Sequence, residues 1–524
     1  MKKFSFLLCL LLFLAANAAS ATLKERCDAL TRPELQAVVQ FLADDLVEGR
    51  APGTRGGELA EIYIQSLFKL LGLQPGWQGS YFQPFELRGF TTRDVRLNAG
   101  GIELGQPDDL MGSYTGEEKD FTVSGRAVFC GFGIRSDIWK WDDFKKADLR
   151  GKVLIVRAND PGLWRSDIFE GRTLTYFGRW TYKMEEAARQ GAAAVLIVHT
   201  DETAGYGWTV VQNSWSGEES YLPAELQDSL RFRGWIREES LKQILAKRNV
   251  KLEKLYQKSL QPGFKPVDLG FDVSFRGRSQ FRSLTTRNVV ATIPGRKPQQ
   301  IVLSAHIDHF GRNPELAGDP IFNGAIDNAV PVAALIQTAR ILNEYKKDLE
   351  YSLVFLACQA EEGGLLGSRY FAENADPATL AAAINFESTP PWEASPEIFG
   401  VGARFSTLEE SLKAVAAAQG WRYSEFSMAD QGFYFRSDQF PFAQIGVPAV
   451  WVSAGERSLA GENKLEKFFR GGAYHTVKDE YDPTWELEGL RQTIKLAVLL
   501  VDRLNREKDP PRWKGRLPFP ISGK

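Results

Sequence analysis

Cysteine is scarce in this sequence, with four in 524 residues. Cys9 lies in an apolar N-terminal run, which leaves Cys27, Cys130 and Cys358. Such an odd and sparse set excludes a fold held together by a framework of disulfides. Whether Cys27 and Cys130 pair in an oxidising compartment is left open by the sequence. Cys358 ends a strand-like apolar run, so we expect a small core residue rather than a nucleophile.

Net charge and long apolar runs are also lacking. Lys and Arg number 64 against 66 Asp and Glu, a net charge of −2, so nothing in the composition favours a nucleic-acid partner. No stretch reaches the roughly 20 apolar residues of a membrane span, which argues against a stable membrane anchor. With 44% apolar and 25% charged residues, the composition is typical of a globular protein. At roughly 150 residues per domain, the length predicts more than one domain.

Residues 1–21 have the pattern of a secretory signal peptide. Lys2 and Lys3 precede a 13-residue, almost wholly apolar run from Phe4 to Ala16, and small residues suited to cleavage continue to Ala21. A basic start, a short apolar run and a small-residue cleavage site are typical of export. We therefore predict an exported protein, either periplasmic or secreted.

The rest of the chain changes in character twice. It begins with helical patterns on either side of a glycine-rich loop, Glu48–Gly57. Short β-rich runs and turns then alternate as far as Gly263. From Thr286 strands alternate with helices, which predicts an α/β fold with a mostly parallel sheet and helices on both faces. The predicted parts are the N-terminal part of the α/β domain (22–113), a β-rich insert (114–263), the remainder of that domain (264–508) and a C-terminal tail (509–524).

Histidines and carboxylates follow the predicted strands of the α/β domain. The carboxyl ends of parallel strands meet at one edge of a sheet, where ligands bind. Each of these residues taken alone could be a helix cap, a strand-end pair or a surface residue. Together, imidazole and carboxylate groups predict a site for a borderline metal, with zinc favoured. The set comprises His306, Asp308, Asp327, Glu361, Glu362, Glu387 and His475.

The sequence lacks the motifs of three other common catalytic or nucleotide-binding sites. It contains no His-Glu-x-x-His zinc helix, no Gly-x-Ser-x-Gly elbow and no Gly-x-Gly-x-x-Gly loop. His199 follows a predicted strand without a second histidine or a carboxylate motif beside it. We expect His199 to be a structural residue.

Five segments around these residues resemble the metal-site motifs of a known family, the di-zinc exopeptidases related to bacterial leucyl aminopeptidase and glutamate carboxypeptidase II. The spacings of 21 residues from His306 to Asp327 and 34 from there to Glu361 fit that family. The resemblance runs from Arg32 to about Asn505. The five segments are Ser304–His309, Gly324–Asn328, Ala360–Gly363, Asn385–Glu387 and Tyr474–Thr476.

The middle of the chain is similar to a second kind of domain. Asp148–Leu154 resembles a segment of the protease-associated (PA) domain that is often inserted into these enzymes. The resemblance therefore implies a zinc peptidase domain interrupted by a PA domain at residues 114–263.

The resemblance also implies a set of metal ligands. Asp327 would bridge two zinc ions per chain. His306 and Glu387 would complete one zinc site, and Glu362 and His475 would complete the other. Two zinc ions held in this way can lower the pKa of a bridging water and polarise a peptide carbonyl.

Three further residues receive roles from the same resemblance. Glu361 would be the general base that acts on a metal-bound water and passes the proton to the leaving amine. Asp308 would orient the His306 ring by a hydrogen bond. Tyr474 would stabilise the oxyanion. Two departures from the family pattern, at Val330–Pro331 and at Gln439, bear on substrate preference rather than on the ligands.

The expected substrates are peptides, and the favoured activity is that of an aminopeptidase. The carboxylates of the site suit a substrate's terminal ammonium group. A carboxypeptidase would instead bind a terminal carboxylate through arginine, for which only Arg404 and Arg436 are candidates. The alternatives are a carboxypeptidase, a glutaminyl cyclase on the same fold, and a receptor-like binding protein without catalysis. The sequence leaves the oligomeric state open.

Overall fold

The computed structural model describes residues 21–226 and 230–521. The predicted signal peptide, residues 1–21, lies outside the described residues apart from Ala21, and export stays a prediction. Within the described ranges, no helix combines the length and the apolar character needed to cross a membrane.

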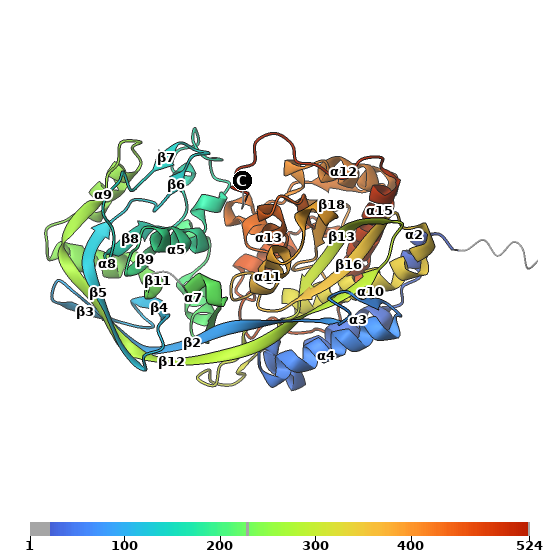
Figure 1. Ribbon diagram of the computed structural model, residues 1–524, viewed down its shortest axis with the longest axis horizontal. Helices are drawn as coiled ribbons and strands as arrows, with labels where there is room; N and C mark the ends of the chain where they lie inside the picture. The colour runs from blue at the N-terminus through green and yellow to red at the C-terminus, as the bar shows by residue number, and fades with distance from the viewer. Residues whose placement is uncertain (1–20, 227–229, 522–524) are drawn as a thin grey trace, which may run out of the picture.

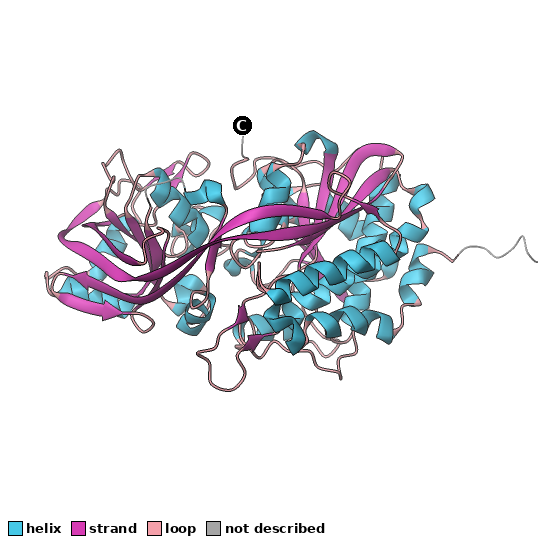
Figure 2. Ribbon diagram, turned by 60° about the horizontal axis from the view of Figure 1, so that its bottom comes forward, coloured by secondary structure: helices cyan, strands magenta, loops and turns pink. Residues whose placement is uncertain are grey.

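Two lobes lie side by side along the long axis of the molecule (Figure 1). We call residues 22–81 and 289–521 the large lobe and residues 100–266 the small lobe. Two long antiparallel strands, β2 (Phe82–Ala99) and β12 (Val267–Ile293), form a ribbon that runs along both lobes and joins them (Figure 2). Phe82 pairs with Val289 at one end of this ribbon, and Ala99 pairs with Val273 at the other.

The sheet of the large lobe is mostly parallel, as predicted. Four adjacent strands, β20, β17, β13 and β16, run parallel to one another, and β12 and β18 flank them in the antiparallel direction. The apolar runs after Thr286 predict five strands, at 288–293, 300–305, 351–357, 382–386 and 447–452, and all five occur in this sheet. In spatial order it contains β19 (Arg422–Ser424), β18 (Glu397–Val401), β20 (Ala449–Ala454), β17 (Leu380–Asn385), β13 (Lys297–His306), β16 (Tyr351–Cys358) and β12.

Helices cover both faces of this sheet because its central strands are apolar on both sides. Along β13, Ile301 and Leu303 pack into the core on one face, and Val302 packs into the core on the other. The first core holds α2 (Leu23–Asp28), α3 (Arg32–Leu42), α4 (Arg55–Leu70), α10 (Val330–Glu344), α12 (Leu408–Gln419) and α15 (Glu488–Arg506). The second holds α11 (Leu366–Glu373), α13 (Gln439–Gln444) and α14 (Lys464–Arg470).

The small lobe is a layered α/β unit of its own. Its strands β5 (Asp120–Phe129), β8 (Val153–Arg157), β9 (Ala194–His199) and β11 (Phe232–Arg237) run parallel, and β4 (Leu110–Tyr114) pairs antiparallel at the edge. One face packs on α5 (Trp180–Arg189) and α7 (Trp208–Ser214), and the other on α8 (Glu238–Ala246) and α9 (Leu252–Ser259). The predicted insert at 114–263 falls within this lobe, and its identity as a PA domain stays a prediction.

Short elements complete the fold. They are β1 (Gln74–Pro75), β3 (Ile102–Gly105), β6 (Arg135–Ser136), β7 (Trp141–Asp142), α6 (Asp201–Ala204), β10 (Glu219–Tyr221), β14 (Gly311–Arg312) and β15 (Ile321–Phe322).

The three described cysteines are buried and free. Cys27 packs in a core of the large lobe and Cys130 in a core of the small lobe, so the pairing that the sequence left open does not form. Cys358 is buried at the end of β16, which confirms the prediction of a core residue.

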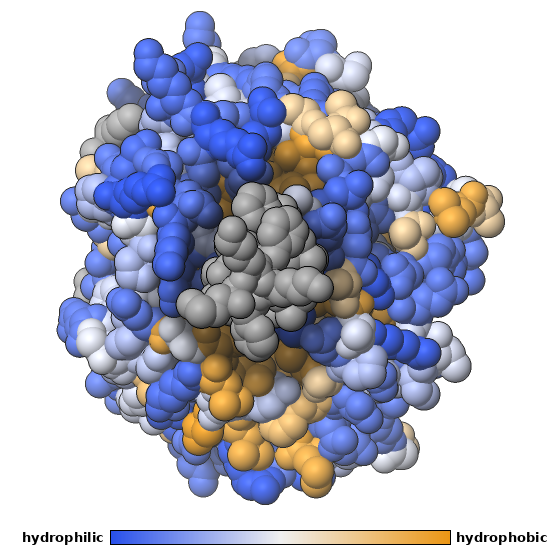
Figure 3. Space-filling model, turned by 90° about the vertical axis from the view of Figure 1, so that its right-hand side faces the viewer, coloured by the Kyte–Doolittle hydropathy of each residue, from blue (hydrophilic) through white to orange (hydrophobic). Residues whose placement is uncertain are grey.

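The outer end of the large lobe is mainly hydrophilic. Apolar side chains gather in patches, chiefly in the lower part of this face (Figure 3). Among the described residues, the large apolar side chains that are well exposed are Leu46, Ile62, Leu70 and Leu459. Single exposed apolar residues are ordinary on protein surfaces and need no functional explanation.

Candidate active site

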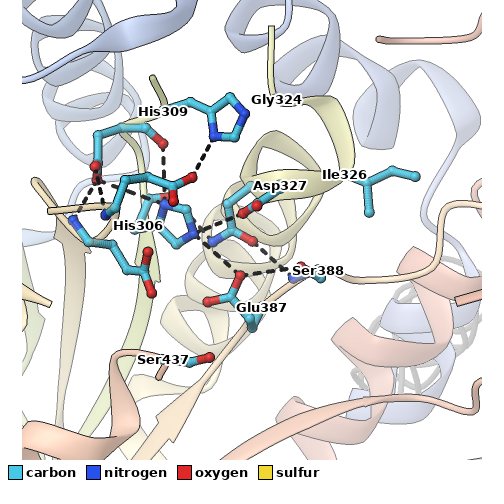
Figure 4. A network of polar contacts seen from close by, with 12 residues as sticks. His306, His309, Gly324, Ile326, Asp327, Glu387, Ser388 and Ser437 are labelled. Carbon is cyan, nitrogen blue, oxygen red and sulfur yellow. Dashed lines mark hydrogen bonds and ion pairs between the residues drawn. The ribbon is translucent and has the colours of Figure 1, made fainter. Parts of the chain in front are cut away.

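Three neighbouring parallel strands end at one edge of the large sheet, and the predicted site residues follow them. β13 ends at His306, the turn after β16 carries Glu361 and Glu362, and Glu387 follows β17. Figure 4 shows His306, Asp327 and Glu387 pointing toward one another. Strand order therefore brings together residues that are far apart in the sequence.

Asp327 reaches the same edge from the turn Ala325–Ala329, ahead of α10. The backbone N–H groups of Ile326 and Asp327 donate to the two carboxylate oxygens of Asp479, each at 2.9 Å. Gly324 precedes the turn with a φ of 59°, and a β-carbon there would lie 2.3 Å from the carbonyl oxygen of Asp327. Only glycine allows this close approach of backbone to backbone.

The side chains form two groups that share Asp327. Nε2 of His306 lies 3.2 Å from Oδ1 of Asp327 and 3.3 Å from Oε1 of Glu387. Nε2 of His475, which enters from the loop after α14, lies 3.3 Å from Oδ2 of Asp327 and 3.3 Å from Oε2 of Glu362. The two oxygens of one carboxylate thus face two different histidines.

These spacings fit tetrahedral zinc. Zinc bonds to nitrogen and oxygen of about 2.0–2.1 Å, set at tetrahedral angles, place neighbouring ligand atoms about 3.3 Å apart. The four N···O distances of the two groups lie at 3.2 to 3.3 Å. Oε2 of Glu387 is buried and has no hydrogen-bond partner among the described residues. The residues present therefore fit two metal ions in geometry and in donor type.

The site concentrates negative charge in a buried place. Burial raises the pKa of Glu361 well above its ordinary value, and the carboxylates of Glu362 and Glu387 add to the rise. Burial, together with the charge of Asp327, raises the pKa of Glu362 to about 8. Asp327 differs: burial acts to raise its pKa, but hydrogen bonds from His306 and His475 hold it well below the ordinary value. Bound cations would stabilise such a cluster of carboxylates.

Asp308 contacts the site differently from the expectation. Its carboxylate accepts the backbone N–H groups of Glu361 at 3.1 Å and of Glu362 at 3.3 Å. Nδ1 of His306 is 3.8 Å from that carboxylate, but only 3.2 Å from the backbone carbonyl of Asp308. The backbone carbonyl of Asp308 therefore accepts the hydrogen bond from the His306 imidazole, while the Asp308 carboxylate accepts the N–H groups of the Glu361–Glu362 turn.

Tyr474 lies against the second histidine. Its ring stacks on that of His475 with centroids 3.7 Å apart, and its hydroxyl accepts a hydrogen bond from Arg436 at 2.5 Å. Tyr474 lines a cavity that also exposes Glu361 and Glu362. The phenol is thus within the same cavity as the carboxylates that follow β16.

The cavity has walls from both lobes. Trp180, Tyr206 and Trp215 of the small lobe line it together with Glu361 and Tyr474 of the large lobe. A substrate that enters this cavity would contact both lobes at once.

Two residues near the site had no role assigned from the sequence. Nδ1 of His309 lies 2.6 Å from Oε1 of Glu362, and Asp479 holds the Asp327 turn. His309 belongs to the segment Ser304–His309 and could have been noticed there, whereas nothing in the sequence around Asp479 indicated its contacts. His199 lies apart from the site, with its Nε2 3.1 Å from the carbonyl of Tyr206, as expected of a structural histidine.

Arg50 connects the glycine-rich loop Glu48–Gly57 to the site. Its side chain is fully buried, and its guanidinium donates to the carbonyls of Ile307 at 2.8 Å and Gly324 at 3.0 Å. The same guanidinium also donates to the carbonyls of Leu42 and Asn323. Arg50 thus holds the backbone beside both His306 and Asp327.

Replacing Arg50 with methionine is expected to lower the free energy of unfolding by about 2–4 kcal/mol, because buried carbonyls would lose their donors. Arg55→Met is the matched control, since that side chain is 69% exposed and, among the described residues, its one ion pair is with Glu48; its loss should cost at most about 1 kcal/mol. Chemical denaturation of both variants makes the comparison. Equal stabilities would show that Arg50 does not hold this backbone.

The large lobe matches the family model described as Peptidase family M28 over residues 288–500. Among curated proteins, "Aminopeptidase YwaD" of Bacillus subtilis (strain 168) is 24% identical over 247 residues, which are 45% of this chain and 49% of that protein. A "Probable zinc metalloprotease" of Pyrenophora teres f. teres (strain 0-1) is 38% identical over 104 residues, 19% of this chain and 22% of that protein. The chain thus spans about half or less of the length of these relatives.

A solved structure shares the fold of the whole chain. It is the "Aminopeptidase from Aneurinibacillus sp. strain AM-1", with a TM-score of 0.57 and 19% identity over 96% of this chain and 99% of that one. The matched residues 288–500 include both histidine–carboxylate groups and Glu361. The matched part of the large lobe, residues 288–500, is thus a domain of peptidase family M28.

Proposed function

We propose that this protein is an exported, zinc-dependent aminopeptidase that removes N-terminal residues from peptides. The observation that carries the proposal is the pair of histidine–carboxylate groups that share Asp327, with Glu361 beside them. Membership of peptidase family M28 and the names of the relatives support a zinc peptidase. The N-terminal sequence pattern supports export to the periplasm or the exterior.

In this proposal five residues hold two zinc ions. His306 and Glu387 would hold one, His475 and Glu362 would hold the other, and Asp327 would help to hold both. When bound, the pair of ions would polarise the peptide carbonyl and make water a better nucleophile at neutral pH.

Glu361 is the proposed general base. It adjoins the ligand Glu362, but it belongs to neither of the two groups that share Asp327. Burial raises its pKa, so its carboxylate holds a proton more readily than an exposed glutamate does. It would take a proton from the attacking water and give it to the leaving amine. Tyr474, whose hydroxyl is held by Arg436, is the proposed donor to the oxyanion.

The choice between the two ends of a peptide depends on the charges of the cavity. Glu361, Glu362 and Glu387 suit a terminal ammonium group, which favours the aminopeptidase. Of the two arginines considered from the sequence, Arg436 lines the cavity, whereas Arg404 is paired with Glu170 elsewhere. A carboxypeptidase is therefore the second candidate. The complete set of ligands together with Glu361 argues against a non-catalytic receptor, and a glutaminyl cyclase has no specific observation in its favour.

The deciding experiment compares one tripeptide, Leu-Ala-Ala, in two blocked forms. We expect the form amidated at its carboxyl end to be cleaved and the form acetylated at its amino end to resist cleavage. Zinc content measured on the same preparation should approach two ions per chain. Cleavage of the acetylated peptide alone would instead assign a carboxypeptidase.

A further inference from the structure

Arg179, just before α5 in the small lobe, has no carboxylate in direct contact among the described residues, although Glu361 acts on its charge from farther away. It is 8% exposed and lines the cavity opposite Glu361. Among the described residues, no carboxylate lies within 4 Å of its guanidinium and no acceptor bonds to it, and its Nε is buried without a partner. A buried, unpaired guanidinium is costly, so it indicates that a ligand supplies the missing anion.

Arg436 brings a second guanidinium to the same cavity. It donates to the hydroxyl of Tyr474 at 2.5 Å and lies 4.9 Å from the ring centroid of Phe433. It too has no carboxylate partner within 4 Å among residues 21–226 and 230–521. Burial, together with the neighbouring charge of Arg436, lowers the pKa of Arg179 to about 10. Both arginines remain cationic at neutral pH and repel each other, so an anion bound between them would be stabilised by both charges.

The third arginine of the cavity, Arg369, does have a carboxylate partner. Arg369 also lines the cavity, but its guanidinium pairs with Glu225 and donates to the carbonyl of Gly364 at 3.3 Å. Among the described residues, the lack of a carboxylate partner is therefore a property of Arg179 and Arg436 and not of every arginine in the cavity.

The position of the pair defines which part of a substrate would reach it. Arg436 holds Tyr474, and Tyr474 stacks on His475, whose Nε2 faces Asp327. One side chain thus separates Arg436 from the group of residues proposed to hold metal. An anion bound by the arginines would belong to a residue next to the bond that is cleaved.

We propose that Arg179 and Arg436 form a subsite that binds a carboxylate on the residue following the scissile bond. This rests on the proposed function and adds a substrate class to it, short or acidic peptides. The carboxylate has two sources, the carboxyl end of a dipeptide or an acidic side chain in a longer peptide. Guanidinium groups suit either source, because they bind carboxylates through paired, charge-assisted hydrogen bonds.

Three substrates with a free amino end distinguish the two sources of the carboxylate. They are Leu-Gly, its amide Leu-Gly-NH2, and Leu-Glu-NH2. Relative to Leu-Gly-NH2, we expect kcat/KM to be about tenfold or more higher for the substrate whose carboxylate reaches the arginines, a difference of about 1.4 kcal/mol. A preference for Leu-Gly identifies the terminal carboxylate, and a preference for Leu-Glu-NH2 identifies the side chain. Equal values for all three would overturn the subsite.

Arg179→Gln removes the unpaired charge. It should bring the ratio of kcat/KM for the preferred substrate to kcat/KM for Leu-Gly-NH2 close to one. Because the ratio compares two substrates on one preparation, it does not depend on the fraction of protein that is folded. Arg404→Gln is the control, since that exposed arginine pairs with Glu170 and should keep the ratio. A ratio that Arg179→Gln leaves unchanged would also overturn the proposal.

Failure of the proposed function gives a different result. If Leu-Gly-NH2 resists cleavage and N-acetyl-Leu-Gly is cleaved, the enzyme is a carboxypeptidase, and the effect of Arg179→Gln on that cleavage tests the subsite. If no peptide is cleaved, the melting temperature is measured in N-acetylglycine and in N-acetylglycinamide. If N-acetylglycine raises the melting temperature more than N-acetylglycinamide does, and Arg179→Gln abolishes that difference, the subsite is supported. Equal rises with the two compounds overturn it.

Discussion

Glu361→Gln is expected to keep the zinc content of the protein and to lower kcat by about 10²–10⁴-fold, the usual contribution of a general acid/base. Glutamine has nearly the same size and keeps a polar side chain beside Glu362, so the ligands should stay in place. It cannot accept and release a proton, so the step assigned to Glu361 should fail. Elemental analysis and steady-state kinetics on one preparation provide the two measurements.

The control for this variant is Glu373→Gln. Glu373 ends α11, the helix that follows the Glu361–Glu362 turn, and it is exposed. Its replacement should leave kcat within about twofold, since a solvated side chain outside the cavity has no role in proton transfer. Near wild-type turnover in a zinc-replete Glu361→Gln protein would remove Glu361 from the proposed mechanism.

Asp327→Ala is expected to empty both metal sites together. Its two oxygens face His306 and His475 separately, so one substitution removes a ligand from each site. His475→Ala should affect one site only, since Nε2 of His475 contacts Glu362 and one oxygen of Asp327. Zinc per chain should therefore fall toward zero in the first variant and toward one in the second.

His199→Ala is the matched control for the loss of a buried histidine. His199 lies in the small lobe and contacts the carbonyl of Tyr206, so its loss should leave zinc content unchanged even if stability falls. Circular dichroism of all three variants checks that they are folded. An Asp327→Ala protein that still holds two zinc ions would place the bridge elsewhere.

The site could be predicted from the sequence because its residues directly follow successive apolar runs along the chain. His306 ends an apolar run, and Glu361 and Glu387 follow the next two runs, so a parallel sheet brings them together wherever the rest of the chain lies. The contacts of Arg50 could not be predicted in this way. Its acceptors Ile307 and Asn323 lie more than 250 residues away in the sequence, and no periodic pattern encodes such a contact.

The ribbon was missed for a different reason. Only Asn288–Ile293 at the end of β12 was predicted as a strand, because that part is buried in the large sheet. Further back, buried or partly buried apolar residues alternate with polar or exposed ones from Val267 to Phe275. That alternation is the pattern of a half-buried strand, but the strand predictions relied on continuous apolar runs and did not include it. The lack of a carboxylate in direct contact with Arg179 could not be predicted either, since it depends on three-dimensional neighbours from both lobes.

The ribbon also affects the order in which the newly made chain can acquire its structure. β2 is synthesised early, but its partner β12 emerges only after the whole small lobe, residues 100–266. The parallel strands of that lobe lie within one continuous stretch, so their contacts close shorter loops than the pairing of Phe82 with Val289. The helices α3 and α4 must wait still longer, because the core that covers them comes from β13 and α10. Folding from the middle of the chain outward is thus built into the topology, and the N-terminal segment stays without its partners for most of synthesis.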